Sequence, residues 1–351
     1  MMEYSENSNI KTYIKSKRLK FWRNGMATIK DIAEKAGVTA TTVSRVINNR
    51  GYISDETRSK VFSIMKEMNY HPNEAARALS KKHTNIIGVI VPHITHPFFS
   101  KLISNLESAA SARNYKILLC NSKDQPEKEA EYLDMCISNK VAGIILCSKY
   151  VDAAKFKKLH IPIIHFEQEE KSEESITIQC DNYQGGRLAA KHLIDQGCKK
   201  LLHFGGVLKK DMPADRRADG FRDICQEEGV ESIVLMSDQL AYGSMHYQSY
   251  IEKGLKENEG VDGIFASSDL IASQVIQVCN DLNIKIPEQV KLVGFDDVMI
   301  ATVTTPTITT IHQPIKEMSE LSIEYIEKKL KGEMIPSNVY MPVKLIKRNS
   351  T

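Results

Sequence analysis

The stretch Thr28-Ile-Lys-Asp-Ile-Ala-Glu-Lys-Ala-Gly-Val-Thr-Ala-Thr-Thr-Val-Ser-Arg-Val-Ile-Asn48 decides how the first part of this chain folds. Apolar side chains recur at its start with the spacing of one helix face, namely Ile29, Ile32, Ala33 and Ala36. Gly37 then interrupts the helical pattern, and Thr39 is placed to cap a second short helix. Two short helices joined by a tight turn that contains glycine predict a helix-turn-helix.

The second of these helices has an apolar side and a polar side. We expect Val43, Val46 and Ile47 to point inward and the outward side to carry Ala40, Thr41, Ser44 and Arg45. An arginine fork can bind guanine, a threonine hydroxyl can bond a base or a phosphate, and an alanine methyl can pack on a thymine methyl. The outward side therefore predicts a DNA-reading surface, and a structural three-helix unit with a polar face is the alternative.

A third helix and a short connecting segment complete this region. Ser54 is placed to cap the helix, whose apolar stripe consists of Val61, Ile64, Met65 and Met68. Pro72 ends the helical pattern, because proline cannot continue a helix. Residues 73–79 are expected to form one or two helical turns, and residues 81–84 have the composition of a linker.

Charge is unevenly distributed along the 351 residues, whose net charge is +3. Residues 1–25 carry six Lys or Arg and two acids, residues 26–83 carry ten and six, and the remainder carries 31 and 36. A basic amino-terminal part on a mildly acidic body is typical of a phosphate-binding module joined to a separate folded domain. A basic segment can also be a solvated surface, so charge alone does not decide the function.

Residues 1–25 lack apolar periodicity and are predicted to be a disordered extension. The codons of Trp22 and Arg23 can form a purine-rich ribosome-binding site, which indicates a mis-assigned start and Met26 as the first residue. A basic arm that touches DNA is the competing interpretation.

Beyond residue 85, apolar β-branched runs alternate with amphipathic segments of helix length. The runs are Ile86–Val91, Lys116–Cys120, Val141–Cys147, Ile161–Phe166, Leu201–Phe204, Ile233–Leu235, Gly263–Ala266 and Leu292–Phe295. Alternation at this spacing predicts βαβ units around parallel sheets, with enough strands for two lobes.

Composition indicates a cytoplasmic globular protein of two or three domains, with 42% hydrophobic and 26% charged residues. No apolar run approaches the roughly 20 residues that span a bilayer, and the amino terminus lacks the pattern of a secretory signal. Seven scattered cysteines without a CxxC pair predict buried, reduced thiols: Cys120, Cys136, Cys147, Cys180, Cys198, Cys225 and Cys279. Four histidines have no metal-ligand spacing, so no metal or cofactor is expected: His160, His165, His192 and His203.

The helix-turn-helix stretch closely resembles the DNA-binding head of the lac-repressor family. Further segments with that family's pattern follow in order: Tyr70-His-Pro-Asn73 with Ala76 and Leu79, Ile87–Pro92, Asp181-Asn182 with Gly185-Gly186, Arg217–Phe221, Val293–Asp297 and Thr309–Gln313. The resemblance covers the chain from Met26 to near its end. Two finer features are most similar to repressors of sucrose operons in Gram-positive bacteria: Val46–Tyr52 with Asn69-Tyr70, and Asn121-Ser122 before Glu131–Leu133.

The resemblance implies an α/β protein with a three-helix head, a hinge helix and two doubly wound lobes like those of periplasmic sugar-binding proteins. The head corresponds to residues 26–71, the hinge to 72–84 and an effector-binding and dimerisation core to 85–351. Within the core, lobe 1 is expected at about 85–196 and 313–342, and lobe 2 at about 197–312 and 343–351.

The resemblance also implies roles in DNA binding. Base-reading positions fall on Ala40, Thr41 and Arg45, and phosphate-contacting positions fall on Thr28, Thr39, Asn48, Tyr52 and Ser54. Leu79, with Ala76 beside it, falls on the residue that is wedged into the minor groove, although an ordinary helix-core leucine is the alternative. Two hinges must meet at one base step, which implies a homodimer on near-palindromic operator DNA.

A cleft between two α/β lobes binds ligands at the carboxyl ends of strands. Asp296 follows the run Leu292–Phe295 directly, so its carboxylate can accept from sugar hydroxyls, and Arg217 can donate through its fork. Both match effector positions of the family, and we expect the two side chains to face each other across the cleft. Asp297 is expected to cap the next helix or to pair locally.

Other residues on cleft positions are Phe98 and Phe99 as an apolar wall, with Gln184, Ser268 and Gln313 as polar groups. Ser268 stands where relatives often carry Asn, and Gln184 stands where some carry Asp, so the ligand's identity stays open. The competing interpretations are a solvated Arg217 beside Arg216, and phenylalanines that belong to the core.

These features together predict a regulator of carbohydrate-utilisation genes, in the family's sense a repressor, that responds to a small sugar or sugar phosphate. A global regulator with a phosphoprotein co-repressor and a repressor that responds to a non-sugar metabolite are the alternatives. An enzyme is not expected, because GxGxxG after a strand, GxxxxGK[ST] and a nucleophile elbow are all missing. An exported sugar-binding protein has no use for a helix-turn-helix.

Overall fold

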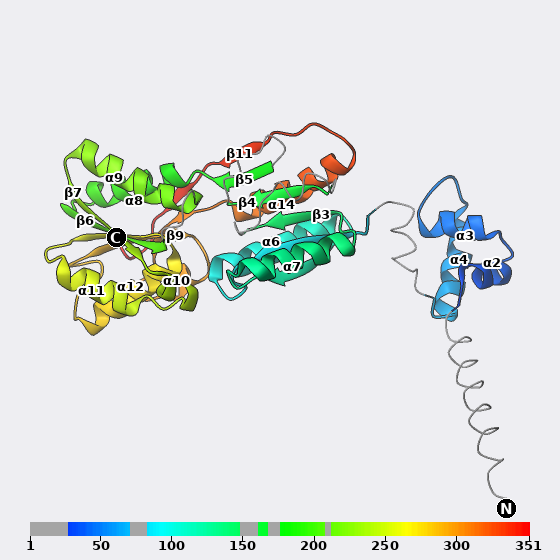
Figure 1. Ribbon diagram of the computed structural model, residues 1–351, viewed down its shortest axis with the longest axis horizontal. Helices are drawn as coiled ribbons and strands as arrows, with labels where there is room; N and C mark the ends of the chain where they lie inside the picture. The colour runs from blue at the N-terminus through cyan, green and yellow to red at the C-terminus, as the bar shows by residue number, and fades with distance from the viewer. Residues whose placement is uncertain (1–26, 71–82, 148–160, 168–175, 208–211) are drawn as a thin grey trace, which may run out of the picture. The chain divides into compact units, whose positions relative to one another are not determined.

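The computed structural model describes residues 27–70, 83–147, 161–167, 176–207 and 212–351. Contacts divide the chain into two compact units, residues 1–80 and residues 81–351 (Figure 1). We call the described part of the first unit the head and the second unit the core.

The head contains three helices around a small apolar centre: α2 (Ile29–Ala36), α3 (Ala40–Ile47) and α4 (Asp55–Glu67). Side chains from all three helices are buried there, including Ile32, Ala33, Val43, Val46, Val61, Ile64 and Met65. Gly37 ends α2 with a φ of 68°, a left-handed conformation that glycine adopts without strain. The predicted helix-turn-helix is therefore confirmed, and so is the inward stripe of the third helix.

The core is built from strands that alternate with helices. Its first part contains β1 (Ile86–Val91), α6 (Pro97–Ala112), β2 (Lys116–Asn121), α7 (Pro126–Ser138), β3 (Gly143–Leu146), β4 (Ile163–Phe166), β5 (Ile176–Cys180) and α8 (Asn182–Asp195). The middle part contains β6 (Lys200–Val207), the 3-10 helix η2 (Pro213–Asp215), α9 (Arg216–Glu228), β7 (Glu231–Ser237), α10 (Gln239–Ser244), α11 (Gln248–Glu257) and β8 (Gly263–Ala266). The last part contains α12 (Asp269–Asp281), β9 (Lys291–Asp296), α13 (Ile300–Val303), β10 (Thr309–His312), α14 (Ile315–Leu330), β11 (Asn338–Met341) and β12 (Lys344–Ile346).

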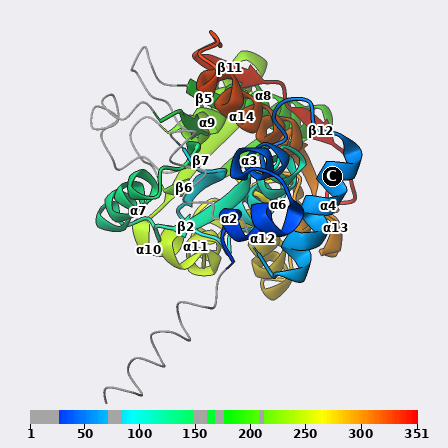
Figure 2. The same ribbon diagram turned by 90° about the vertical axis from the view of Figure 1, so that its right-hand side faces the viewer.

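The strands form two six-stranded sheets, each the centre of one lobe. Their orders are β11-β5-β4-β3-β1-β2 in lobe 1 and β12-β10-β9-β8-β6-β7 in lobe 2. All recorded pairs are parallel except β10 with β12. In lobe 2, α8 and α9 cover one face of the sheet, and α11 and α12 cover the other (Figures 1 and 2). Helices on both faces of a parallel sheet confirm the doubly wound architecture.

One lobe boundary differs from the prediction. Helix α8 was expected in lobe 1, but it packs against α9 and against β9 of lobe 2. The chain therefore passes between the lobes directly after β5, at Asp181, and not near residue 196. Hydrophobic periodicity predicts a helix here but does not indicate which sheet the helix covers. The helix was assigned to the sheet of lobe 1, and the predicted boundary was therefore placed after it instead of before it.

Four strands were not among the predicted apolar runs: β5, β10, β11 and β12. Strand β5 is buried at every position although it contains Thr177 and Gln179. These polar residues interrupt the apolar run that would have identified a buried strand in the sequence. Strands β11 and β12 lie at the sheet edges, where partial exposure permits polar residues.

All seven cysteines are buried, as predicted. Among the residues described, no helix has both the length and the apolar character needed to cross a membrane.

Candidate functional site

The exposed side of α3 presents the predicted base-reading residues. Thr41 and Arg45 are exposed and one helical turn apart, while Ala40 is half-buried against the head's centre. Val43 and Val46 on the opposite side are fully buried, and they fix the orientation of the helix. An arginine and a threonine on the free face of the second helix of this motif can reach base edges in a major groove.

The predicted phosphate-contacting residues lie at helix ends or in the exposed loop after α3. Thr28, Thr39 and Ser54 cap α2, α3 and α4, and each side-chain oxygen accepts from a backbone N–H. Asn48 caps the other end of α3 and donates to the carbonyl of Ser44 at 2.8 Å. The side chain of Tyr52 is 100% exposed, which is unusual for an aromatic residue without a partner molecule. Ala76 and Leu79 lie outside the described residues.

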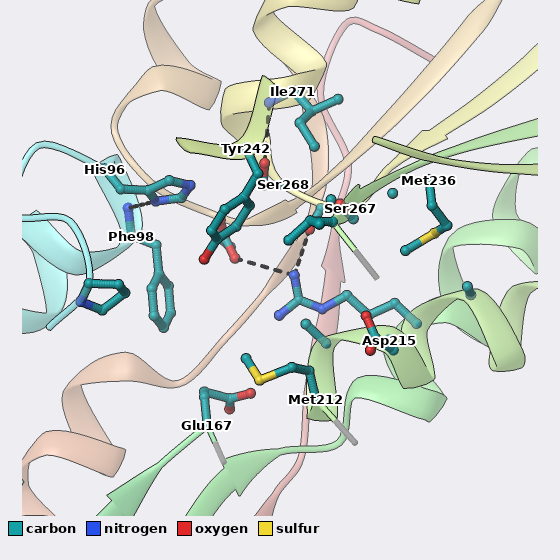
Figure 3. A pocket seen from close by; sticks show the side chains of 18 of the residues that line it. His96, Phe98, Glu167, Met212, Asp215, Met236, Tyr242, Ser267, Ser268 and Ile271 are labelled. Atoms are coloured by element: carbon teal, nitrogen blue, oxygen red, sulfur yellow. Dashed lines mark hydrogen bonds and ion pairs between the residues drawn. The ribbon is translucent and has the colours of Figure 1, made fainter. Parts of the chain in front are cut away.

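The core contains a cavity of about 530 Å³ between the two lobes. Its lining comes from the carboxyl ends of strands in both sheets and from the loops that follow them. Figure 3 shows His96 and Phe98 entering from α6, Glu167 from the end of β4, and Tyr242, Ser268 and Ile271 from lobe 2. The predicted residues Phe98, Phe99, Arg217, Ser268, Asp296 and Gln313 all line this cavity.

Close contact between α8 and α9 fixes the position of Arg217. A side chain at Gly186 would bring its Cβ to 2.0 Å from the carbonyl oxygen of Arg217, and one at Gly220 would meet the carbonyl oxygen of Tyr183 at the same distance. These two glycines therefore let the helix backbones approach until Arg217, in the first turn of α9, reaches the cavity.

Arg217 is buried and forms several polar contacts, so a solvated surface role is excluded. Its Nε donates to Asn182 Oδ1 at 2.7 Å, and its Nη1 donates to the carbonyl oxygen of Ser267 at 2.5 Å. The guanidinium lies 3.6 Å from the centroid of the Phe295 ring, and Nη1 lies 3.8 Å from Asp296 Oδ1. Arg217 and Asp296 both belong to lobe 2, on α9 and β9, so they form one wall together and do not face each other across the cleft as predicted.

Asp296 occupies a strained backbone position at the end of β9, with a φ of 108°. Such positions persist only where surrounding contacts over-determine them, and they cluster at binding sites. Burial raises the pKa of Asp296 to about 7, against the opposing effects of Arg217 and of the hydrogen bond from Gln313. Its neighbour Asp297 pairs with His312 at 2.8 Å and with Arg348 at 2.5 Å, the local pairing that we expected.

Gln313 lines the cavity beside Asp296 and forms a hydrogen bond with it. Its Nε2 donates to Asp296 Oδ1 at 2.6 Å, and its Oε1 is buried with no hydrogen-bond partner in the described part of the chain. A buried acceptor without a donor costs free energy unless a ligand or a water supplies the donor. This oxygen therefore marks a place where a ligand hydroxyl can donate.

Sequence reasoning missed two polar residues of the same network. Glu167 accepts from the backbone N–H of Cys180 at 2.5 Å and from Asn182 Nδ2 at 2.9 Å, and burial raises the pKa of Glu167. Asn182 accepts in turn from Arg217, so a continuous polar chain runs from lobe 1 to lobe 2. Glu167 directly follows an apolar run, which is the signal that identified Asp296.

Gln184 does not line the cavity, which corrects the prediction for this residue. Its side chain is exposed, and its backbone N–H donates to the helix-capping Asp181 at 2.9 Å. Successive residues of a helix are rotated by about 100° about its axis. Gln184 follows Asn182 by two positions in α8, so its side chain points away from the side of the helix on which Asn182 lies.

The remaining lining is largely apolar and aromatic, with polar side chains already engaged. Ser268 caps α12 by accepting from the backbone N–H of Ile271 at 3.2 Å. Burial lowers the pKa of His96 to about 4 and that of His203 to about 3, so both imidazoles are neutral near pH 7. In the described residues no group of three or more His, Cys, Asp or Glu side chains is arranged to hold a metal ion. The arrangement suits non-covalent binding of a hydroxyl-bearing molecule.

The head and the core each match a family model built from known proteins. The family model for bacterial regulatory proteins of the lacI family matches residues 28–73, and the model for the periplasmic binding protein-like domain matches residues 190–351. The chain is 37% identical over 325 residues to the sucrose operon repressor of Streptococcus mutans, which covers 93% of this chain and 99% of that protein. This chain belongs to the lacI family.

Other lacI-family relatives agree with this assignment. The ribose operon repressor of Halalkalibacterium halodurans is 33% identical over 327 residues, or 93% of this chain and 97% of that protein. A solved periplasmic binding protein/LacI transcriptional regulator of Alkaliphilus metalliredigens, complexed with D-xylulofuranose, is 32% identical with a TM-score of 0.68. The match covers 76% of this chain and 99% of the chain in that structure. The lacI-family chain described here is a DNA-binding regulatory protein, as its helix-turn-helix predicted.

Proposed function

We propose that this protein represses carbohydrate-utilisation genes in the cytoplasm and has no catalytic activity. It binds a near-palindromic operator as a homodimer through the head (residues 26–71) and the hinge (72–84). A sugar or sugar phosphate in the core (85–351) controls that binding. The names of its relatives, which include sucrose and ribose operon repressors, support the assignment to sugar genes.

One observation carries this proposal: the buried polar chain Glu167–Asn182–Arg217–Asp296–Gln313 at the inter-lobe cavity. All of these residues except Asn182 line the cavity. Glu167 belongs to lobe 1, and Arg217 and Asp296 belong to lobe 2, so a ligand that engages them touches both lobes at once. A ligand shifts a two-state protein only through different affinities for the two states. A site shared by two lobes supplies that difference, because a change in lobe orientation changes its contacts.

For DNA binding, we propose that Ala40, Thr41 and Arg45 read bases. Thr28, Thr39, Asn48, Tyr52 and Ser54 position the phosphates, and Ala76 and Leu79 enter the minor groove. For the effector, we propose contacts with Phe98, Phe99, Arg217, Ser268, Asp296 and Gln313, to which Glu167 is added.

The test is selection of an operator from random duplexes, followed by binding measurements with and without sugars. We expect a near-palindromic site that binds two chains and is bound at least a thousandfold more tightly than a scrambled duplex. An effector sugar should change operator affinity by about 5–150-fold, and operator DNA should change sugar affinity by the same factor. Equal affinity for selected and scrambled duplexes would contradict the DNA-binding role, and no response to any sugar would contradict the effector class.

A further inference from the structure

Asp269 is a fully buried carboxylate next to the effector residues of lobe 2. It is the first residue of α12, and it is not among the described residues that line the cavity. Its Oδ2 accepts from the backbone N–H of Val298 at 2.9 Å, and its Oδ1 accepts from the Thr310 hydroxyl at 2.6 Å. One side chain of α12 therefore holds both the segment after β9 and the neighbouring strand β10.

Gly294 in β9 provides the space for this carboxylate. A Cβ at Gly294 would lie 2.4 Å from Asp269 Oδ1, so a larger residue there would displace the carboxylate. In the register of the sheet, Gly294 lies opposite Thr310. Asp269 therefore reaches across β9 two residues before Asp296 and meets the strand that leads to Gln313.

The bond to Val298 fixes the far end of a strained turn. Asp296 has a φ of 108° and Asp297 a φ of 53°, values that residues other than glycine rarely adopt. Such a conformation persists only where the surrounding contacts over-determine it. Lys101 binds the carbonyl of Asp297, and Asp269 binds the backbone amide that follows it. Asp269 is thus one of the contacts that hold the turn in which Asp296 is presented to the cavity.

An acid at this position has a cost that its contacts must offset. Burial, followed by the charge of Asp296, raises the pKa of Asp269 well above its usual value. An apolar residue would avoid this cost, but it would leave the buried N–H of Val298 without its acceptor. The two hydrogen bonds that Asp269 accepts are therefore the physical reason for an acid here.

We infer that Asp269 is a positioning residue for the effector site, because it holds Asp296 and Gln313 in place through the backbone and does not touch the ligand. This inference rests on the proposed function, since it assumes that an effector binds in the cavity. The role requires an acceptor oxygen at position 269 and does not require a negative charge.

Asp269→Ala and Asp269→Asn separate the acceptor from the charge. Both lose the carboxylate, but Asn keeps an oxygen for the Val298 N–H and has an amide that can donate to the Thr310 hydroxyl. Hydrogen exchange of the full-length proteins without ligand follows the Val298 amide directly. We expect exchange to be about tenfold faster or more in Asp269→Ala and within about threefold of wild type in Asp269→Asn. Unchanged exchange in Asp269→Ala overturns the inference, because other contacts then hold the turn.

Calorimetric titration with sucrose, fructose and ribose measures the consequence for the cavity. For a sugar that binds the wild type, we expect Asp269→Ala to lose about tenfold or more in affinity and Asp269→Asn to lose less than about threefold. Val278→Ala is the control for a general loss of stability, because it removes buried apolar atoms from the same helix and no hydrogen bond. It should lower the melting temperature and leave the sugar affinity within about threefold of wild type.

Each other outcome has a definite meaning. Equal losses of sugar affinity in Asp269→Ala and Val278→Ala would show that Asp269 only stabilises the core, and a loss in Asp269→Asn as large as in Asp269→Ala would show that the charge acts. Either result overturns the inference and leaves the proposed sugar response intact. If none of the three sugars binds the wild type, the proposed response to a sugar fails and the inference fails with it.

Thr310→Val keeps the inference testable if Asp269→Ala does not fold. The change is isosteric and removes the hydroxyl that donates to Asp269 Oδ1. We expect it to weaken binding of the same sugar by about threefold or more and to speed exchange of the Val298 amide, because the carboxylate is held less firmly. Wild-type sugar affinity and exchange in folded Thr310→Val contradict the inference.

Discussion

Arg45 is the residue whose side chain offers the most specific DNA contact in the head. It is exposed on α3, and Val43 and Val46 on the opposite side of the helix are buried in the head's apolar centre. We expect Arg45→Ala to cost about 1–3 kcal/mol of operator affinity per lost contact and to relax selectivity at one base pair in each half-site. Fluorescence anisotropy with a set of singly substituted operators measures both effects.

Lys66→Ala is the matched control for Arg45, because it removes one exposed positive charge from α4. It should weaken binding to all duplexes by a similar small factor and leave selectivity unchanged. If Arg45→Ala also weakens operator and scrambled duplex equally, Arg45 contacts only the phosphate backbone.

Asp296 should make the stability of the protein depend on pH in a predictable direction. Its pKa is about 7 in the folded protein, whereas a solvated aspartate titrates near 3.9. Between these values the folded state holds a proton that the unfolded state has released, so the free energy of unfolding falls as pH rises. Asp296→Asn lacks this fall, and the variant should gain stability relative to the wild type from about pH 4 to about pH 7.

Thermal melting of the two proteins without effector, at several pH values in this window, tests the prediction. Glu167 and Asp269 also have raised pKa values through burial, but they are present in both proteins and largely cancel in the difference. A difference in melting temperature that stays constant across the window shows that the pKa of Asp296 is not raised.

At the scale of elements, the crossing of α8 and α9 is the contact that brings Arg217 into the cavity. Gly186→Ala places a methyl group 2.0 Å from the backbone carbonyl oxygen of Arg217. This clash is with a backbone atom, so α8 or α9 must shift to relieve it. We expect the substitution to lower the free energy of unfolding by about 3 kcal/mol, the upper end for overpacking, and to weaken effector binding. Chemical denaturation and sugar titration measure the two effects.

Gly243→Ala in α10 is the control for this contact, since no atom lies within 4 Å of the added methyl group. It should raise stability by about 0.5–1 kcal/mol, because alanine favours a helix over glycine. Similar melting temperatures for Gly186→Ala and the wild type would show that α8 and α9 can separate without cost.

At the scale of the whole core, one lysine joins the two lobes beside the effector residues. Lys101 Nζ, on α6 of lobe 1, donates to the backbone carbonyl of Asp297 in lobe 2 at 2.7 Å. Asp297 directly follows Asp296, and its carboxylate is held by His312 and Arg348. The position of lobe 1 is therefore coupled to the strained segment that presents Asp296 to the cavity.

We expect Lys101→Met to weaken sugar binding about tenfold or more, because a charge-assisted hydrogen bond contributes about 1.5–3 kcal/mol and this one joins the two lobes that form the cavity. Lys329→Met, an exposed change on α14 of lobe 1, is the control and should have no effect. Calorimetric titration measures both variants. Equal sugar affinity in Lys101→Met and the wild type would show that the two lobes are oriented by other contacts.

The three helices of the head and the alternation of strands and helices in the core could be predicted from the sequence. Short-range signals are sufficient there: Thr28 and Asp31 form reciprocal capping bonds at 2.7 and 3.3 Å, and Gly37 ends α2 in a left-handed conformation. Apolar runs such as Ile86–Val91 and Gly263–Ala266 appear as strands with the same bounds. The carboxylate of Asp296 was predicted because it directly follows such a run, and residues after parallel strands gather at one edge of the sheet.

Three features could not be predicted from the sequence: the lobe that α8 joins, the outward direction of Gln184, and the polar chain from Glu167 through Asn182 to Arg217. These features depend on strand order and on contacts between segments far apart in the chain. Hydrophobic periodicity reports which side of an element is buried, but it does not report which sheet buries that side. For the same reason, the pKa of Asp296 depends on its burial and on contacts with Arg217 and Gln313, which lie far from it in the chain or in other elements.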